Sequence, residues 1–240
     1  MDNNQSNTGH ISASMGDSIS EVQSLTLEMA GVVEASYANA LTGLIKGESE
    51  LSHNVATHDF MTNKFEIEID EKCNTLLALQ TPVAKDLRTI VVILRIITDL
   101  ERVGDEAEKI ARLSLKLNYD NIDTSFLKSL EHLGNSTSLA LNKAIDAYAR
   151  RSVEDAFEVI TEDKKVDVEY EACMRQLISY IVKIEENKIV KNFIDISTCA
   201  KSIERIGDHA KNIAQHTIYL IKGKDVRHTS IEQVRSEIEE

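Results

Sequence analysis

Two pairs of acidic residues carry the clearest chemical signal in this sequence. Glu101 and Asp105 form the pattern Glu-x-x-x-Asp, and Glu204 and Asp208 repeat it. In a helix this spacing places both carboxylates on one face, about 5–6 Å apart at Cβ, where like charges repel unless a cation lies between them. Ligand sets made only of oxygen suit hard cations such as Mg²⁺, Mn²⁺, Ca²⁺ or ferric iron. The same spacing also fits a solvated acidic helix face, so both interpretations stay open.

Further oxygen donors precede each pair. Asp163 and Asp167 lie at helical spacing before the second pair, and Asp59 and Asn63 occupy the matching positions before the first. If their helix packs beside the motif helix, four oxygen ligands converge in each half of the chain. Asparagine supplies a neutral oxygen, so the first half has one charge fewer. The alternative is a polar stripe that Lys164 or Lys165 neutralises. The donors in the first half are Asp59, Asn63, Glu66 and Asp70.

Basic side chains accompany both motifs, because Arg102 and Arg205 each follow the glutamate. Arg102 is placed to pair with Glu106 along the helix. Alternatively, the two arginines hold a carboxylate or a phosphate of a partner. They are therefore candidate partner-binding residues.

The sequence contains no catalytic constellation. Its 7 histidines are scattered, and Glu50-Leu51-Ser52-His53 alone fits the Glu-x-x-His pattern that di-iron bundles carry twice. A glycine-rich phosphate loop, a serine nucleophile elbow and an HExxH motif are all missing. We therefore expect a protein that is not an enzyme.

The motif belongs to an internal repeat. Glu101-Arg102-Val103-Gly104-Asp105 recurs as Glu204-Arg205-Ile206-Gly207-Asp208, and Ile110-Ala111 recurs as Ile213-Ala214. The chain therefore contains two copies of a unit of about 100 residues, a usual domain size. The glycine inside each motif costs about 1 kcal/mol relative to alanine in a helix, which indicates the close approach of either a neighbouring helix or a ligand, with helix packing favoured.

Composition predicts an all-α fold. The 240 residues include 1 proline and 9 glycines, so turns are few and helices long. In each copy the last helix has an apolar seam at steps of three and four, which places the seam on one face. We expect two tandem antiparallel three-helix bundles. The expected helices are 18–46, 48–80 and 82–118 in the first copy, and 124–150, 153–187 and 189–222 in the second.

These helices define four segments. Residues 1–17 are expected to form a flexible tail, 18–118 the first repeat and 124–222 the second. Residues 223–240 are a charged tail that is either disordered or a short extra helix. Helix ends are expected at Gly47 and Gly223, and caps at Thr81 and Ser152.

Charge and cysteine content limit the function further. The net charge of −13 disfavours nucleic-acid binding. The 3 widely spaced cysteines form neither a disulfide framework nor a CxxC site, so we expect buried thiols and a reducing compartment. The sequence has no signal peptide and no apolar run long enough to span a bilayer, so we expect a cytoplasmic protein that is not inserted in a membrane.

With these motifs in view, the chain resembles the PhoU family over nearly its whole length. The segments that carry the resemblance are Leu100–Asp105, Ser202–Asp208, Glu162–Asp167, Gln80–Pro82 and Asp86–Arg88. The resemblance implies two tandem three-helix bundles, often in a homodimer. It also places the metal motif of the family on Glu101, Asp105, Glu204 and Asp208, with Asp163, Asp167, Asp59 and Asn63 as its middle-helix counterparts. The implied metals are Mg, Mn, Zn or Fe.

The resemblance also implies a role in signalling. Proteins of this family are negative regulators of the phosphate-starvation response that restrain phosphate uptake. They look like adaptors between the ATPase subunit of the phosphate ABC transporter and a membrane histidine kinase, associated peripherally with membrane complexes. The alternative is a metal-binding helical bundle with a storage role or another signalling role.

Overall fold

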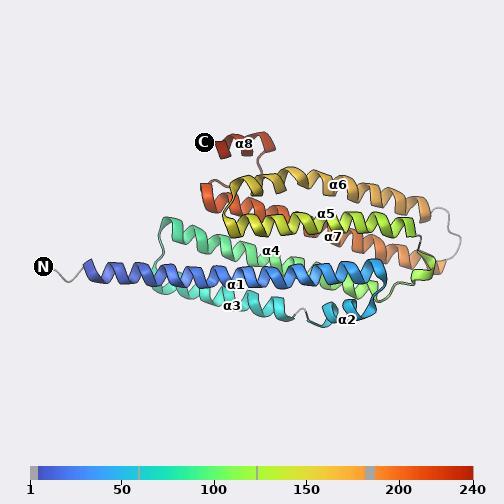
Figure 1. The fold of residues 1–240 in the computed structure, drawn as a ribbon, viewed down its shortest axis with the longest axis horizontal. Helices are drawn as coiled ribbons and strands as arrows, with labels where there is room; N and C mark the ends of the chain where they lie inside the picture. The colour runs from blue at the N-terminus through green and yellow to red at the C-terminus, as the bar shows by residue number, and fades with distance from the viewer. Residues whose placement is uncertain (1–4, 59, 123, 182–186, 240) are drawn as a thin grey trace.

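The structure, a computed structural model, describes residues 5–58, 60–122, 124–181 and 187–239. These residues form α-helices and one short 3₁₀ helix, without a strand among them, which confirms the all-α prediction. Figure 1 shows long helices lying side by side. The elements are α1 (Gln5–Lys46), α2 (Ser49–His58), α3 (Phe60–Gln80), α4 (Ala84–Ser114), η1 (Tyr119–Asn121), α5 (Thr124–Arg150), α6 (Val153–Ile181), α7 (Asn187–Lys222) and α8 (Ile231–Glu239).

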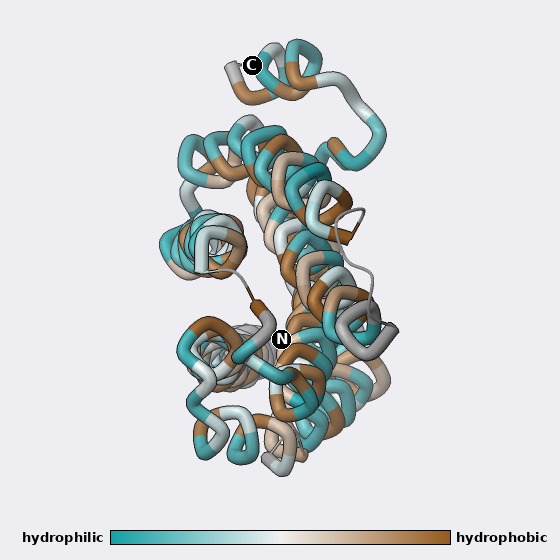
Figure 2. The backbone as a smooth tube through the Cα atoms, turned by 90° about the vertical axis from the view of Figure 1, so that its right-hand side faces the viewer, coloured by the Kyte–Doolittle hydropathy of each residue, from teal (hydrophilic) through white to brown (hydrophobic). Residues whose placement is uncertain are grey.

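Two antiparallel bundles pack side by side. The first contains α1, α4 and the consecutive pair α2 and α3, and the second contains α5, α6 and α7. The bundles meet where α4 packs against α7 and α1 packs against α5, while α8 lies outside on α6 (Figure 1). Figure 2 shows polar and apolar stretches alternating along the helices, as expected for helices that bury one face.

The predicted apolar seams form the centre of the molecule. Every seam residue of α4 and α7 is fully or almost fully buried, so the periodicity identified the packed faces correctly. Gly207 lies on the α7 face that meets α6, because a Cβ atom at this position would be 3.2 Å from Val166 Cγ1. The buried seam residues are Ile93, Ile96, Leu100, Val103, Ala107 and Ile110, and Ile196, Cys199, Ile203, Ile206, Ala210 and Ile213.

Most predicted helix ends are confirmed. The Ser152 hydroxyl accepts a hydrogen bond from the backbone N–H of Asp155 at 3.1 Å, as an N-cap does. Gly47 and Gly223 have φ angles of +69° and +76°, the left-handed conformation that ends helices. The predicted cap at Thr81 is wrong, because α4 begins at Ala84 and no side chain caps it.

The structure corrects two further segments and decides between the alternatives for a third. Residues 5–17, expected as part of a flexible tail, belong to α1, because its apolar face extends to Met15, which is buried with Ile19. The expected helix 48–80 appears as α2 and α3, with residue 59 outside the described part. The charged segment 223–240 contains α8, whose Val234 is buried.

A buried hydrogen bond joins the bundles at the contact of α1 with α5. The buried Tyr37 hydroxyl donates to the Gly134 carbonyl oxygen at 3.0 Å. The helices are close here, since a Cβ atom on Gly134 would lie 2.4 Å from Leu41 Cδ1.

Replacing Tyr37 by phenylalanine tests this contact. We expect Tyr37→Phe to lower the free energy of unfolding by about 0.5–1.5 kcal/mol, because a buried hydrogen bond is lost. For a chain of this size that equals a fall in Tm of about 1–6 °C. Tyr180→Phe is the control, because the Tyr180 hydroxyl makes an exposed bond to Ser125. Equal Tm values for the two variants in thermal unfolding would contradict the prediction.

Candidate functional site

The predicted acids of the second repeat lie together, and we call them the second acidic cluster. Glu204 and Asp208 project from α7, and Asp163 and Asp167 from α6, which packs beside it. Burial and the negative charges of Glu204, Asp163 and Asp167 raise the pKa of Asp208 above its ordinary value. The helix packing therefore brings Glu204, Asp163 and Asp167 within electrostatic reach of Asp208.

Two lysines neutralise part of this cluster. Lys201 Nζ lies 2.6 Å from Glu204 Oε2, and Lys211 Nζ lies 2.5 Å from Asp163 Oδ2. Both lysines come from α7, whereas Lys165, which the sequence suggested as a neutralising residue, binds another carboxylate of its own helix. The sequence identified the acids but not the lysines that pair with them. Lys211 on α7 pairs with Asp163 on α6, and Lys201 pairs with Glu204 one turn further along α7.

The first repeat presents a different set of acids, the first acidic cluster. Burial and the charges of Asp70 and Asp105 raise the pKa of Glu66 on α3. Burial and the charges of Glu108 and Glu106 likewise raise the pKa of Asp105 on α4. The cluster therefore consists of Glu66, Asp70 and Asp105, with Glu101 half-buried one turn before Asp105.

The two residues predicted as middle-helix ligands in the first repeat are Asp59 and Asn63, and neither is among the described members of the first acidic cluster. Asp59 lies outside the described residues. Asn63 is exposed and lines a hollow of about 370 Å³ along α3 with Phe60 and Ile67. Glu66, one turn further along α3, is the residue whose charge interacts with Asp105.

The oxygen donors are of the type that suits a hard cation, but the described side chains are not gathered around one point. Within the described ranges, no group of three or more His, Cys, Asp or Glu side chains is arranged to hold a metal ion. In the second acidic cluster Lys201 and Lys211 already balance two carboxylates. In the first acidic cluster burial is the larger cause of the raised pKa values of Glu66 and Asp105, and the charges of neighbouring acids add to it. A cation bound there would relieve the part of the shift that comes from like charges.

The two motif arginines differ in their contacts. Arg205 Nη1 on α7 lies 2.9 Å from Glu106 Oε1 on α4, across the interface between the repeats. Burial raises the pKa of Glu106, but its polar and cationic neighbours, Arg205 and Lys109 among them, outweigh it and lower the value. Arg102 is exposed, and within the described part of the chain it has no hydrogen bond or ion pair.

A buried polar network at the same interface was not predicted. The Asp99 carboxylate on α4 lies 2.8 Å from His209 Nδ1, 3.3 Å from His216 Nε2 and 3.2 Å from Asn212 Nδ2, all on α7. Burial raises the pKa of Asp99, but hydrogen bonds from these three side chains outweigh it and lower the pKa to about 2. Asp99 is therefore an ionised group between the bundles.

The internal repeat places a second contact, equivalent to the Asp99 network, on the other side of the interface. In the repeat alignment Asp99 corresponds to Ser202, and His209 corresponds to Glu106. Asp99 hydrogen-bonds to His209, and Ser202 lies near Glu106, although the Ser202 hydroxyl has no hydrogen-bond partner among the described residues. The repeats thus meet with approximate two-fold symmetry, but with different chemistry on the two sides. The substitution of histidine for glutamate inside the repeated segment was the available sequence signal.

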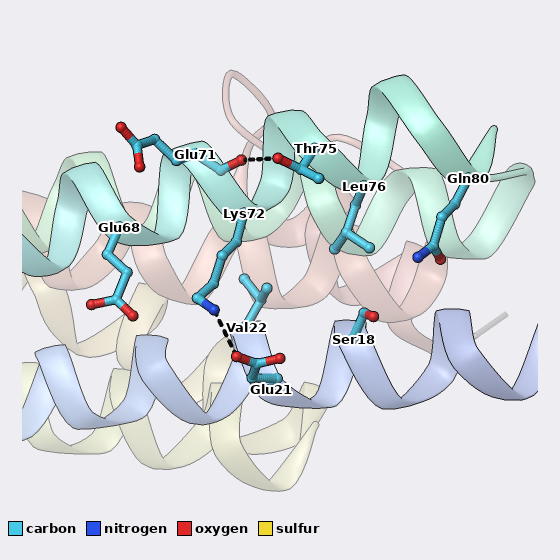
Figure 3. A pocket seen from close by; sticks show the side chains of 9 residues that line it. All are labelled: Ser18, Glu21, Val22, Glu68, Glu71, Lys72, Thr75, Leu76 and Gln80. Atoms are coloured by element: carbon cyan, nitrogen blue, oxygen red, sulfur yellow. Dashed lines mark hydrogen bonds and ion pairs between the residues drawn. The ribbon is translucent and has the colours of Figure 1, made fainter.

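Another cavity lies away from these motifs. A hollow of about 470 Å³ opens between α1 and α3, where Lys72 Nζ lies 2.7 Å from Glu21 Oε1 (Figure 3). Its lining mixes both charges with two apolar side chains, and none of the predicted site residues takes part. The lining residues are Ser18, Glu21, Val22, Glu68, Glu71, Lys72, Thr75, Leu76 and Gln80.

Fold and clusters together define a class: tandem three-helix bundles with a Glu-x-x-x-Asp motif on the last helix of each repeat. The chain belongs to the PhoU family, because the sequence model of the PhoU domain matches residues 26–114 and 130–217. Among the described helices, none has the combination of length and apolar character that crossing a bilayer requires.

Individual relatives match this chain in sequence over most or all of its length. The chain is 37% identical over 239 residues to the phosphate-specific transport system accessory protein PhoU homolog of Pseudomonas aeruginosa, covering 100% of this chain and 98% of that protein. It is 37% identical over 219 residues to the accessory protein PhoU of Escherichia coli K12, covering 91% of this chain and 90% of that protein.

Solved structures show the same fold. The crystal structure of PhoU from Pseudomonas aeruginosa matches with a TM-score of 0.82 at 36% identity, covering 87% of this chain and 99% of that one. PhoU from Streptococcus pneumoniae shares the fold at 24% identity, with a TM-score of 0.81 and coverage of 88% and 99%.

The Asp99 network predicts a loss of stability on mutation that depends on pH. We expect Asp99→Asn to destabilise the chain by about 1–3 kcal/mol at pH 7, because the buried donors lose a charged acceptor. The pKa of Asp99 is lowered to about 2 from 3.8, so its contribution is present above about pH 4 and is lost as the pH falls toward 2. Urea unfolding of both proteins at several pH values measures this. A difference that stays constant down to pH 2 would contradict it.

The first acidic cluster predicts the opposite effect. Because the pKa of Asp105 is raised, its ionised form destabilises the folded chain at neutral pH, and this cost disappears as the pH falls through the raised pKa. We expect Asp105→Asn to raise Tm by about 1–2 °C in metal-free buffer at pH 7, from the usual cost of like-charge pairs. We also expect Mn²⁺ to raise the Tm of the unmodified chain more than that of the variant. Glu28→Gln, which removes an exposed charge on α1, is the control and should change neither value.

Proposed function

We propose that this chain is an accessory regulator of a phosphate-specific transport system. In this proposal it restrains phosphate uptake and keeps the phosphate-starvation response off when phosphate is plentiful. Support comes from relatives of that name, which match at 37% identity over essentially their whole length. A non-enzymatic regulatory role agrees with a helical surface on which charge, rather than a reactive group, is the repeated feature.

The proposed mechanism is that of an adaptor. The chain, as a homodimer in the cytoplasm, contacts the ATPase subunit of the phosphate ABC transporter and a membrane histidine kinase. The observation that carries this proposal is the presence of exposed motif carboxylates on both repeats, with Asp105 on α4 and Asp208 on α7. Two equivalent acidic surfaces in one chain suit the docking of basic surfaces, since complementary charge directs association.

Cation binding would regulate this docking. A hard cation among Glu66, Asp105 and Glu101 supplies positive charge to an acidic surface and allows it to meet an acidic partner group. Mg²⁺ and Mn²⁺ match the oxygen donors best, whereas Zn²⁺ is usually held by sulfur and nitrogen as well. Partner affinity then depends on cation concentration, because a ligand that binds one state shifts the equilibrium toward it.

The second candidate function is metal storage by a helical bundle, favoured by the same acidic clusters. The two functions differ in what removal of the chain does to gene expression. Storage predicts altered metal content with an unchanged phosphate response, whereas the adaptor function predicts a response that is active despite abundant phosphate.

Alkaline phosphatase activity in phosphate-rich medium tests the proposed function. We expect high activity in cells that lack this chain and low activity after the chain is restored. The double variant Glu204→Ala with Asp208→Ala should restore repression only in part, because the second acidic cluster loses half of its predicted members. Glu28→Gln should restore it fully. Low activity in cells without the chain would refute the regulatory role, and measurement of cellular manganese and iron would then test storage.

A further inference from the structure

The two symmetry-related sides of the interface between α4 and α7 differ at one position, which is Glu106 on one side and His209 on the other. This difference leaves an arginine without a carboxylate partner among the described residues. On one side Arg205 binds Glu106 at 2.9 Å. On the other side the equivalent arginine is Arg102, and the residue that corresponds to Glu106 is His209. The carboxylate partner is therefore missing there, which explains why Arg102 makes no ion pair within the described residues. An exposed guanidinium without a carboxylate is available to an external anion.

Arg102 borders a hollow that contains two more arginines. The hollow has a volume of about 420 Å³ and is lined by Arg102 and Arg95 from α4 and by Arg227 from the connection between α7 and α8. Val91 and Leu94 form an apolar part of its wall. This volume lies in the range of sites for small organic ligands, about 300–1,000 Å³.

The charges that oppose an anion in this hollow are limited. Asp99 lies in the wall, but its oxygens are engaged by donors from α7. Asp225 lies beside the hollow and binds Arg227 closely: Nε donates to Oδ1 at 3.0 Å and to Oδ2 at 3.2 Å, Nη2 donates to Oδ2 at 2.7 Å, and the backbone N–H donates to Oδ1 at 3.2 Å. The same carboxylate lies 3.9 Å from Arg95 Nη1, which is buried and has no hydrogen-bond acceptor in the described part of the chain.

Asp225 thus pairs closely with Arg227, reaches Arg95 only at 3.9 Å, and forms no ion pair with Arg102 in the described part of the chain. Asp225 and the ionised Asp99 carry two negative charges, whereas Arg95, Arg102 and Arg227 carry three positive charges, so the arginines remain in excess. A phosphoryl group has up to two charges and three terminal oxygens, and guanidinium groups bind such oxygens in pairs with good geometry. Asp225 is 40% exposed, so it can turn toward water when another anion enters.

We propose that this hollow is a binding site for the phosphoryl group of a small phosphorylated molecule. Arg95, Arg102 and Arg227 hold the phosphoryl oxygens in competition with Asp225, and the carbon part of the ligand lies against Val91 and Leu94. The site differs from the acidic clusters in charge and in the ligand it takes. It gives the chain a direct input from a soluble phosphorylated compound, which the proposed adaptor role does not require.

Isothermal titration calorimetry on the purified full-length chain tests this site, with ADP, inorganic phosphate and adenosine as probes. We expect ADP to bind and adenosine not to bind. Arg102→Gln should weaken ADP binding about tenfold or more, because one charge-assisted contact is lost. Asp225→Asn should strengthen it about threefold or more, since the competing carboxylate is removed. Arg175→Gln, at an exposed arginine of α6 outside the hollow, should bind like the unmodified chain.

The outcomes separate the alternatives. Inorganic phosphate binding as tightly as ADP would identify free phosphate as the ligand and overturn the role of Val91 and Leu94. Absence of binding for both phosphate compounds at about 10 mM, or unchanged ADP affinity in Arg102→Gln with an unchanged Tm, would overturn the site. If Arg102→Gln lowers Tm, the tighter binding expected for Asp225→Asn decides the question. The assay contains no transporter or kinase, so its result is independent of the proposed regulatory function.

Discussion

The packing of α4 against α7 is the contact on which the other features depend. Each helix contributes an apolar seam with steps of three and four, and the seam residues are buried. This periodicity fixes the rotation of both helices about their axes. Once Leu100 and Val103 point inward, Glu101 is held at the boundary and Asp105 in solvent. The acidic clusters are therefore a geometric result of the core, and their positions do not require specific polar contacts.

The same helix rotation places polar residues at the rim of the interface, where they make contacts that apolar packing cannot specify. Asp99 meets three donors of α7, and Glu106 meets Arg205. Such buried or half-buried pairs add modest net stability, but a shift of one helix by one turn would leave each charge without its partner. We infer that the apolar seams drive the association of the bundles and that the polar pairs select a single register.

The sequence predicted features that depend on local spacing and missed those that depend on distant partners. The cap at Ser152 and the ends at Gly47 and Gly223 follow from one or two residues, and all three were found. Thr81 fits a cap equally well by type, but its φ of +43° is left-handed rather than extended as in an N-cap, and α4 begins at Ala84. The acids of the second cluster were predicted by repeat alignment. Lys201, Lys211 and the Asp99 network could not be predicted, because which helix faces join is decided by packing over the whole chain.

Covalent linkage of the two repeats permits an interface that neither repeat could form with a copy of itself. In a symmetric dimer of one repeat, if residue i of one copy contacts residue j of the other, then j of the first copy also contacts i of the second. Two copies of the first repeat would oppose Asp99 to Glu106, acid against acid, on both sides of the interface. Two copies of the second would oppose Ser202 to His209. By joining unlike halves, the chain replaces two repulsive contacts with Asp99–His209 and Ser202–Glu106. Duplication within one polypeptide therefore allowed the halves to specialise as complementary partners, and it makes each half dependent on the other.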